Sequence, residues 1–218
     1  MLNVLLQRHI DSELNVLCLG AHCDDIEIGC GGTVLKMIEQ YQRTNVCWVV
    51  FGSDERRAEE AKSAANKFLS GAAAKTVIIH KFRNSFFPYQ GSDIKTCFED
   101  LKSKFSPNVV LTHYRNDLHQ DHRVISDLSW NTWRDHLILE YEIPKYDGDM
   151  GSPNAFFCLD SATARKKIGY ILESFPSQNG KHWFDEETFL ATLRLRGVES
   201  ASPEKYAEGF YCRKLILT

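Results

Sequence analysis

The sequence predicts an α/β protein in which a mainly parallel sheet is covered by helices on both faces. Three observations lead to this fold class. Short apolar runs alternate with amphipathic stretches, only a few residues separate one from the next, and Gly, Pro, Asn or Asp residues mark the boundaries. Strands that alternate with helices in this way form parallel sheets that are covered on both faces.

The first strand and the first helix enclose the most informative stretch of the chain. Val16–Leu19 is an apolar run that predicts a short buried strand, and Thr33–Glu39 has the pattern of a helix. Between them, Ala21–Gly32 combines an imidazole and two carboxylates with a glycine-rich turn. This stretch therefore falls at a strand-to-helix junction, where open α/β sheets bind ligands.

The next elements continue the alternation. Asn45–Phe51 is β-branched and aromatic, which predicts a second buried strand. Arg56–Leu69 is rich in Ala, Glu, Lys and Arg, with apolar residues at helical spacing, which predicts an amphipathic helix. Thr76–His80 repeats the strand pattern, and Ile94–Phe105 repeats the helix pattern until the break at Ser106–Asn108.

The second half of the chain completes the sheet. Val109–Thr112 predicts a fourth strand, and a helix is expected to begin close to His122. The remaining predicted elements are strands at Leu137–Ile143 and Ala155–Leu159, helices at Ser161–Ser174 and Asp185–Leu195, and a closing strand at Gly209–Leu217. The loops at 86–92 and 144–153 are expected to lie at the rim of the fold.

Length and composition favour one domain, residues 1–218, and disfavour several classes of partner. A chain of 218 residues and 25.0 kDa can bury a core without disulfides or a structural metal. A net charge of −3 and a pI near 6.2 disfavour binding to nucleic acid or an anionic membrane. Met1–His9 lacks a cationic leader, and no apolar run is long enough to span a bilayer. We expect a cytoplasmic protein that acts on a small molecule. The sequence leaves open whether the protein forms a homo-oligomer.

The cysteines predict free thiols. Their number is odd, several lie inside apolar runs, and no two of them form a CxxC pair. A disulfide framework and a cysteine-built zinc knuckle are therefore not expected. The seven are Cys18, Cys23, Cys30, Cys47, Cys97, Cys158 and Cys212.

Two polar clusters follow two of the predicted strands. They contain His22, Asp24, Asp25, His119, Asp121 and His122. Because the carboxyl ends of parallel strands meet at one edge of a sheet, we expect both clusters to belong to one site. So many ionisable side chains require a charge that organises them. Two imidazoles and one carboxylate are a common catalytic zinc set that leaves a fourth position for water.

The spacing leaves the individual roles open. A metal-bound water has its pKa lowered to about 7, so a second carboxylate is needed as a base and a further imidazole can stabilise the oxyanion. Consecutive residues of an extended segment point to opposite sides, so Asp24 and Asp25 are not both expected to face the metal. The turn decides which one does. His113 is expected to be a packed or surface imidazole, and Glu208 a strand residue without a catalytic role.

Either cluster alone would indicate little. A histidine before two aspartates is more often a turn whose carboxylate caps a helix, and only the second cluster at an equivalent strand end reverses this interpretation. Gly29–Gly32 lacks the spacing of a dinucleotide fingerprint, and no Gly-Lys-Ser/Thr motif occurs, so a nucleotide cofactor is not indicated.

The two clusters resemble the motifs of the LmbE-like, or PIG-L, family of metal-dependent de-N-acetylases. This family acts on N-acetylglucosamine-containing compounds such as phosphatidylinositol glycans. Ala21–Asp25 is similar to the family's Ala-His-Pro-Asp-Asp, and His119–His122 to its His-Pro-Asp-His. Cys23 and Gln120 stand where the family usually has proline. Later segments, Ser177-Gln178 and Tyr206–Phe210, are also similar, so the likeness runs through nearly the whole chain.

The resemblance implies roles for seven residues. It implies a three-layer, Rossmann-like fold and a zinc ion held by His22, Asp25 and His122, although another divalent ion such as Fe²⁺ suits the same ligands. It further implies Asp24 as general base, His119 as the group that steadies the oxyanion, Asp121 as the partner that orients an imidazole, and Arg57 as a residue that faces the substrate.

We therefore expect a zinc-dependent hydrolase that removes an acetyl group from an N-acetylated, N-acetylglucosamine-like amino sugar or glycoconjugate. One alternative is a hydrolase of another amide or an ester that uses the same metal site. Another is a metal-binding module without catalytic activity. The sequence identifies neither the sugar, nor its aglycone, nor the acyl group.

Overall fold

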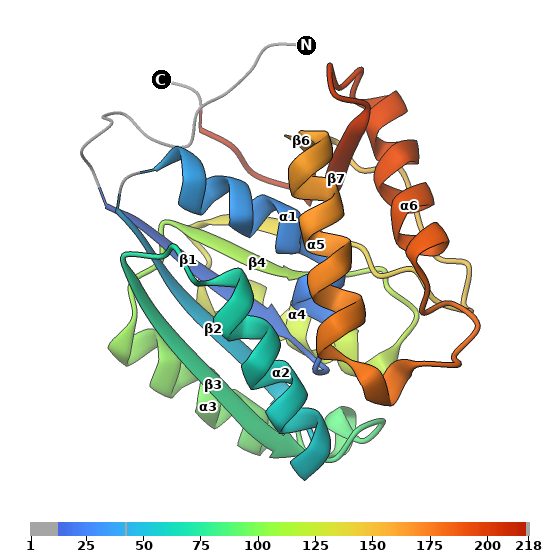
Figure 1. The fold of residues 1–218 in the computed structure, drawn as a ribbon. Helices are drawn as coiled ribbons and strands as arrows, with labels where there is room; N and C mark the ends of the chain where they lie inside the picture. The colour runs from blue at the N-terminus through green and yellow to red at the C-terminus, as the bar shows by residue number, and fades with distance from the viewer. Residues whose placement is uncertain (1–12, 42, 217–218) are drawn as a thin grey trace.

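One mixed sheet lies at the centre of the molecule, as a computed structural model of residues 13–41 and 43–216 shows (Figure 1). Within these residues its order is β3-β2-β1-β4-β5-β7-β6. The strands are β1 Leu14–Gly20, β2 Thr44–Gly52, β3 Ala74–Phe82, β4 Val109–His113, β5 Leu137–Tyr141, β6 Ala155–Leu159 and β7 Tyr206–Cys212. Strands β1 to β5 pair in parallel, and β7 runs antiparallel to β5 and β6.

Helices cover both faces of the sheet. In Figure 1, α1, α2, α5 and α6 lie in front of the sheet, and α3 and α4 lie behind it. The helices are α1 Asp25–Gln40, α2 Glu55–Phe68, α3 Gly91–Lys104, α4 Gln120–Thr132, α5 Ser161–Ser174 and α6 Glu186–Glu199, with short 3₁₀ helices η1 Phe87–Tyr89 and η2 Pro176–Gln178. Two clusters of buried apolar side chains fill the space between the sheet and the helices. The predicted three-layer α/β fold is confirmed.

Two element boundaries differ from the prediction. Helix α1 begins at Asp25, so the glycine-rich stretch is its first turns and not a loop before it. The glycines are needed for close packing, because a Cβ at Gly29 would lie 2.1 Å from the Tyr141 ring and one at Gly31 2.6 Å from Phe68. The last strand spans Tyr206–Cys212, earlier than predicted. Met1–His9, expected to lack a leader, and Leu217 lie outside the described residues.

The topology brings the two polar clusters to one edge. Strands β1 and β4 are neighbours in the sheet, with Val16 opposite Val109 and Cys18 opposite Leu111. Both strands end at the same edge, from which the chain enters α1 and α4. The segments that follow β1 and β4 therefore lie side by side.

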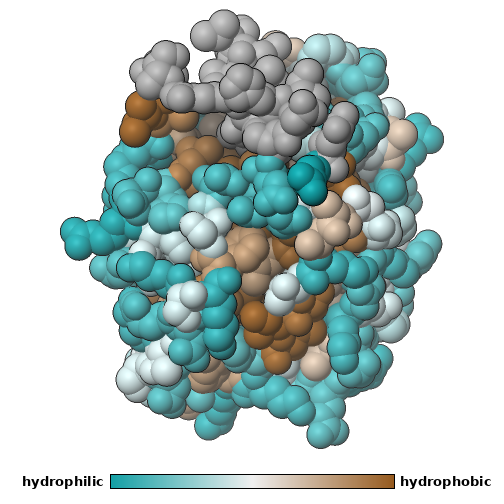
Figure 2. Space-filling view, turned by 90° about the vertical axis from the view of Figure 1, so that its left-hand side faces the viewer, coloured by the Kyte–Doolittle hydropathy of each residue, from teal (hydrophilic) through white to brown (hydrophobic). Residues whose placement is uncertain are grey.

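The edge of the sheet formed by β3 carries partly exposed apolar side chains. Strand β3 has only β2 as a partner, and Val77, Ile78 and Ile79 are half-buried on it. Figure 2 views the molecule from the side on which β3 lies in Figure 1, and shows a brown patch bordered by hydrophilic residues.

Within residues 13–41 and 43–216, no helix is long and apolar enough to cross a membrane.

Candidate metal centre

Three donor atoms from the two clusters form a compact triangle. His22 Nδ1 lies 3.4 Å from Asp25 Oδ2 and 3.2 Å from His122 Nε2, and His122 Nε2 lies 3.6 Å from Asp25 Oδ2. Ligands bound tetrahedrally at about 2.1 Å are separated by about 3.4 Å. The spacing therefore fits three ligands that share one cation.

Two other donor sets overlap this triangle. His22, His119 and His122 offer atoms within 4.8 Å of one another, and so do Asp25, His113 and His122. His122 is common to both sets and to the triangle, so it lies at the centre of the cluster. Cys23 belongs to neither set, and its thiol donates to the carbonyl oxygen of Gly52 at 3.4 Å.

A carboxylate meets the outer nitrogen of each ligand imidazole. His22 Nε2 lies 3.1 Å from Asp121 Oδ2, and His122 Nδ1 lies 2.9 Å from Asp117 Oδ2. A carboxylate at the outer nitrogen favours a proton there, which leaves the inner nitrogen of each imidazole to bind a cation. Carboxylate partners of this kind orient metal-bound imidazoles. Sequence reasoning missed Asp117, although it precedes His119 by two residues in the same connection.

The pKa shifts of Asp25, His122 and His22 indicate that a positive charge is favoured among the donor atoms. Burial raises the pKa of Asp25, but the imidazoles of His122, His113 and His22 outweigh it, and the pKa is lowered. Burial and the neighbouring His113 lower the pKa of His122 to about 3. Burial lowers the pKa of His22, but the carboxylates of Asp25 and Asp121 raise it to about 10. Without a metal, a proton therefore lies among the donors, and a cation would displace it.

His113 takes part in the cluster. Its fully buried Nε2 lies 3.2 Å from Asp25 Oδ2, and its ring stacks on His122 with centroids 4.0 Å apart. The backbone N–H of Ala21 donates to the same nitrogen at 2.9 Å. The packed imidazole expected from the sequence is thus found in contact with the site. Its place as the last residue of β4 was the available signal.

Asp24 faces away from the triangle. Its Oδ1 lies 3.0 Å from Arg57 Nη2, and its side chain makes no capping bond to α1. Burial and the adjacent Asp25 raise its pKa, while the Arg57 guanidinium opposes the rise. For its second oxygen, no hydrogen-bond partner is found in the described part of the chain.

Arg57 belongs to a network behind Asp24. Its Nη1 donates to Glu60 Oε2 at 3.3 Å and to Ser177 Oγ at 3.1 Å, and its guanidinium lies 5.3 Å from the Phe175 ring centroid. The Ser177 hydroxyl and N–H both donate to Glu60. The arginine expected to face the substrate therefore holds Asp24 in this structure.

His119 forms the N-cap of α4. Its Nδ1 accepts the N–H of Asp121 at 3.2 Å, which places the ring proton on Nε2. Its ring lies edge-on to His22 with centroids 4.9 Å apart. Burial lowers the pKa of His119, and the His22 imidazole lowers it further. A neutral Nε2–H donor thus lies beside the triangle.

A match to a family model shows to which protein family the chain belongs. The model of the GlcNAc-PI de-N-acetylase family, PIG-L, matches residues 17–133, more than half of the chain and both polar clusters. The chain belongs to the PIG-L family. Membership in this family makes the chain a de-N-acetylase, and the family is generally metal-dependent.

Solved structures share the fold of this PIG-L protein. N,N′-diacetylchitobiose deacetylase from Pyrococcus horikoshii is 19% identical, with a TM-score of 0.66 over 91% of this chain and 83% of its own. Zinc-inhibited teicoplanin deacetylase Orf2 is 15% identical, with a TM-score of 0.69 over 91% and 97%. GalB, the 4-carboxy-2-hydroxymuconate hydratase of Pseudomonas putida KT2440, is 19% identical, with a TM-score of 0.73 over 94% and 98%. One of these neighbours is named for hydration, so the shared fold does not identify the substrate, which has to be argued from the site.

Proposed function

We propose that this PIG-L protein, as one domain of residues 1–218, removes the acetyl group from an N-acetylated amino sugar or its glycoconjugate. The observation that carries the proposal is the donor triangle of His22, Asp25 and His122 beside an Asp24 that points elsewhere. One carboxylate is thereby available to a metal, and its neighbour is available to a proton.

The donor set fits a divalent ion. His22 Nδ1 and His122 Nε2 lie 3.2 Å apart, a distance that requires a proton or a cation between the two nitrogens. A divalent ion held there by His22, Asp25 and His122 would lower the pKa of a bound water to about 7 and polarise the acetamide carbonyl. We propose zinc, and Fe²⁺ suits the same two imidazoles and one carboxylate.

Asp24 is suited to move the proton. Because Arg57 holds its Oδ1 at 3.0 Å, its other oxygen is left to accept a proton from the attacking water. The amide C–N bond then breaks, and the same carboxyl group returns the proton to the leaving amine. Acetate and the free amino sugar are the products.

His119 is suited to stabilise charge on the reacting carbonyl. Its Nε2–H is not used within the described residues, and it can donate to the oxygen as negative charge develops there. Asp121 and Asp117 orient the two ligand imidazoles.

The seven cysteines are all unpaired, which supports a reducing compartment, and we place the reaction in the cytoplasm.

Acetate release tests the proposal. The protein is stripped of metal, reloaded with zinc or Fe²⁺, and assayed on N-acetylated sugars, sugar nucleotides, glycoconjugates and simple esters. We expect release only from the loaded protein and from an N-acetylated amino sugar. Preferred cleavage of an ester would indicate another hydrolase, and bound metal without any hydrolysis would indicate a binding module.

A further inference from the structure

Asp117, the carboxylate behind the ligand imidazole of His122, has a second charged partner. Its Oδ2 lies 2.9 Å from His122 Nδ1 and accepts from the ammonium of Lys145, also at 2.9 Å. Its Oδ1 accepts the backbone N–H of His119 at 2.8 Å. Three donors at its two oxygens favour the ionised form of this buried carboxyl group. One oxygen of Asp117 therefore divides its negative charge between an imidazole and an ammonium.

The loop at 144–153 fixes the position of Lys145. Lys145 Nζ lies 2.6 Å from Asp149 Oδ1, so a second carboxylate shares the ammonium. Asp149 Oδ2 accepts the backbone N–H of Leu118, the residue after Asp117, at 2.7 Å. The side chains of Lys145 and Asp149 are 12% and 6% exposed, so salt and water screen these contacts little. The loop thus places a fixed positive charge against Asp117.

The carboxylate behind the other ligand imidazole has a different setting. Asp121 Oδ2 lies 3.1 Å from His22 Nε2, and the backbone N–H groups of Ser85 and Phe87 donate to the two Asp121 oxygens at 2.6 and 3.1 Å. Of the residues that the structure describes, no lysine or arginine forms an ion pair with Asp121. Neutral donors therefore share the charge of Asp121, whereas a full positive charge shares that of Asp117.

We propose that Lys145 is a positioning residue that limits the charge Asp117 lends to His122, and so lowers the affinity of the centre for its divalent ion. The inference rests on the metal centre of the proposed function. A carboxylate behind an imidazole makes the ring a stronger metal ligand. An ammonium on the same oxygen withdraws part of that charge, so His122 donates less. More positive charge then stays on a bound ion, where it can polarise the acetamide carbonyl.

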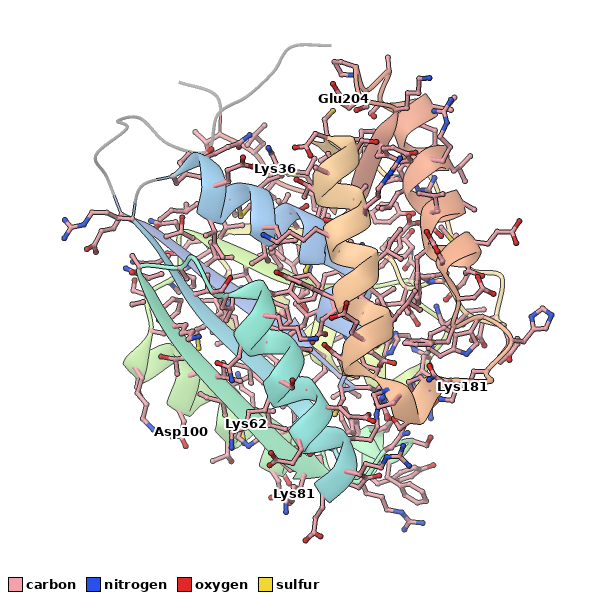
Figure 3. The ribbon with its side chains drawn as sticks, in the orientation of Figure 1. Lys36, Lys62, Lys81, Asp100, Lys181 and Glu204 are labelled. Carbon is pink, nitrogen blue, oxygen red and sulfur yellow. The ribbon has the colours of Figure 1, made fainter. Side chains whose placement is uncertain are left out.

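The zinc affinity of the full chain, measured by competition with a chelating dye, tests the inference. Lys145→Met keeps an unbranched side chain without the charge, and we expect its dissociation constant for zinc to fall about threefold to 10-fold. Asp149→Asn should raise the constant by a similar factor, because the ammonium then acts on Asp117 without a competing carboxylate. Lys62→Met removes the same charge from the exposed face of α2, where Figure 3 shows Lys62. This control should leave the constant unchanged.

A double-mutant cycle separates this role from that of a structural anchor. With Asp117→Asn as the background, Lys145→Met should no longer tighten zinc binding, because the shared oxygen has lost its charge. Weaker zinc binding by Lys145→Met alone would overturn the inference, because it would show that Lys145 only holds the loop in place. Equal tightening in both backgrounds would also overturn it, because the ammonium would then act on the ion directly. If Lys145→Met does not fold, the same cycle with Asp149→Asn decides, and weakening that persists in Asp117→Asn overturns the inference.

Zinc affinity does not depend on turnover, so the inference and the proposed deacetylation can fail separately. Tighter zinc binding by Lys145→Met, without acetate release from any N-acetylated sugar by the wild type, would uphold the inference and contradict deacetylation. Acetate release by the wild type together with an unchanged zinc affinity in Lys145→Met would overturn the inference and leave deacetylation standing.

Discussion

Asp24 and Asp25 are neighbours in the chain, yet their carboxylates have different partners. Asp25 Oδ2 lies among the ring nitrogens of His22, His113 and His122, whereas Asp24 Oδ1 lies against Arg57. They stand at the N-cap and first position of α1, where each residue turns the side-chain direction by about 100°. The start of one helix thus supplies both the proposed ligand and the proposed base.

Replacement of Asp24 by Asn tests that division. We expect Asp24→Asn to keep its metal, because its side chain is outside the donor triangle, and to lose about 10²-fold to 10⁴-fold in kcat, because the amide accepts no proton. Metal content and acetate release are measured on the same preparation. Asp100→Asn, on the exposed part of α3, is the control. Full activity in Asp24→Asn would contradict the assignment.

Glu27 is a second carboxyl with an unusual setting. It is fully buried, and within the described residues neither oxygen has a hydrogen-bond partner. Burial raises its pKa well above the ordinary value of 4.5, and the nearby carboxylates of Asp24 and Asp25 add to the rise. The folded protein therefore holds this group protonated at a pH where the unfolded chain ionises it.

The sign of the resulting pH dependence follows. Because its folded pKa is raised, the stabilising contribution of Glu27 is fully present below about pH 4.5 and is lost as the pH rises towards the folded pKa. Glu27→Gln keeps the shape without the ionisation, so it should unfold like the wild type near about pH 4 and be more stable by about 1 kcal/mol or more near about pH 8. Thermal unfolding measures this, with exposed Glu59→Gln as control. A pH-independent difference would show that folding does not raise the pKa of Glu27.

Part of the site could be predicted from the sequence, and part could not. The meeting of the two polar clusters could be predicted, because it depends only on two strand ends at one sheet edge. The choice of His22, Asp25 and His122 within them rested on the resemblance to the PIG-L motifs. The partners of these side chains could not be predicted. Whether Arg57 faces Asp24 or the solvent depends on Glu60 and Ser177, and the latter is 120 residues away.

At the scale of elements, η2 closes onto the start of α2. Ser177 in η2 donates to Glu60 in α2 through both its N–H, at 2.9 Å, and its hydroxyl, at 2.5 Å. The same hydroxyl accepts from Arg57 at 3.1 Å. The contact fixes the direction of the Arg57 fork, and therefore the orientation of Asp24. A short segment far along the chain thus positions the proposed base.

Ser177→Ala tests this contact. Loss of the hydroxyl leaves the Arg57 fork less constrained, and we expect kcat to fall about fivefold, a loss of about 1 kcal/mol, with KM and metal content unchanged. Ser177→Thr should restore most of the loss, and Ser63→Ala, exposed on α2, should have no effect. A raised KM at constant kcat would instead indicate that Ser177 contacts the substrate.

Helix α1 shows why one element was misjudged from the sequence. Glycine is a poor helix former, so Gly29, Gly31 and Gly32 favour a turn on local propensity. In the fold, side chains at these positions would collide with Tyr141, Phe68 and Leu159. The helix needs glycine to approach its neighbours, and this requirement becomes visible only once the strands are in place.

At the scale of the whole molecule, the order of strands and helices was predictable and the sheet order was not. Periodicity and short connections indicate alternation, which already implies a mainly parallel sheet. They do not show that the last strand, β7, inserts antiparallel between β5 and β6. That insertion places Glu208 of β7 against α1, where it accepts the N–H groups of Gly32 and Thr33 at 2.8 and 2.6 Å. The last strand thus supports the helix that begins the site.

The proposed function depends on one metal ion that is bound between the ends of β1 and β4. Anomalous diffraction from zinc-loaded crystals tests this claim most directly. We predict one peak at about 2.0–2.2 Å from His22 Nδ1, Asp25 Oδ2 and His122 Nε2, with Asp24 outside bonding distance. A peak bonded to His113 or Cys23 in place of one of these ligands would contradict the account, as would a protein that stays metal-free in stoichiometric zinc.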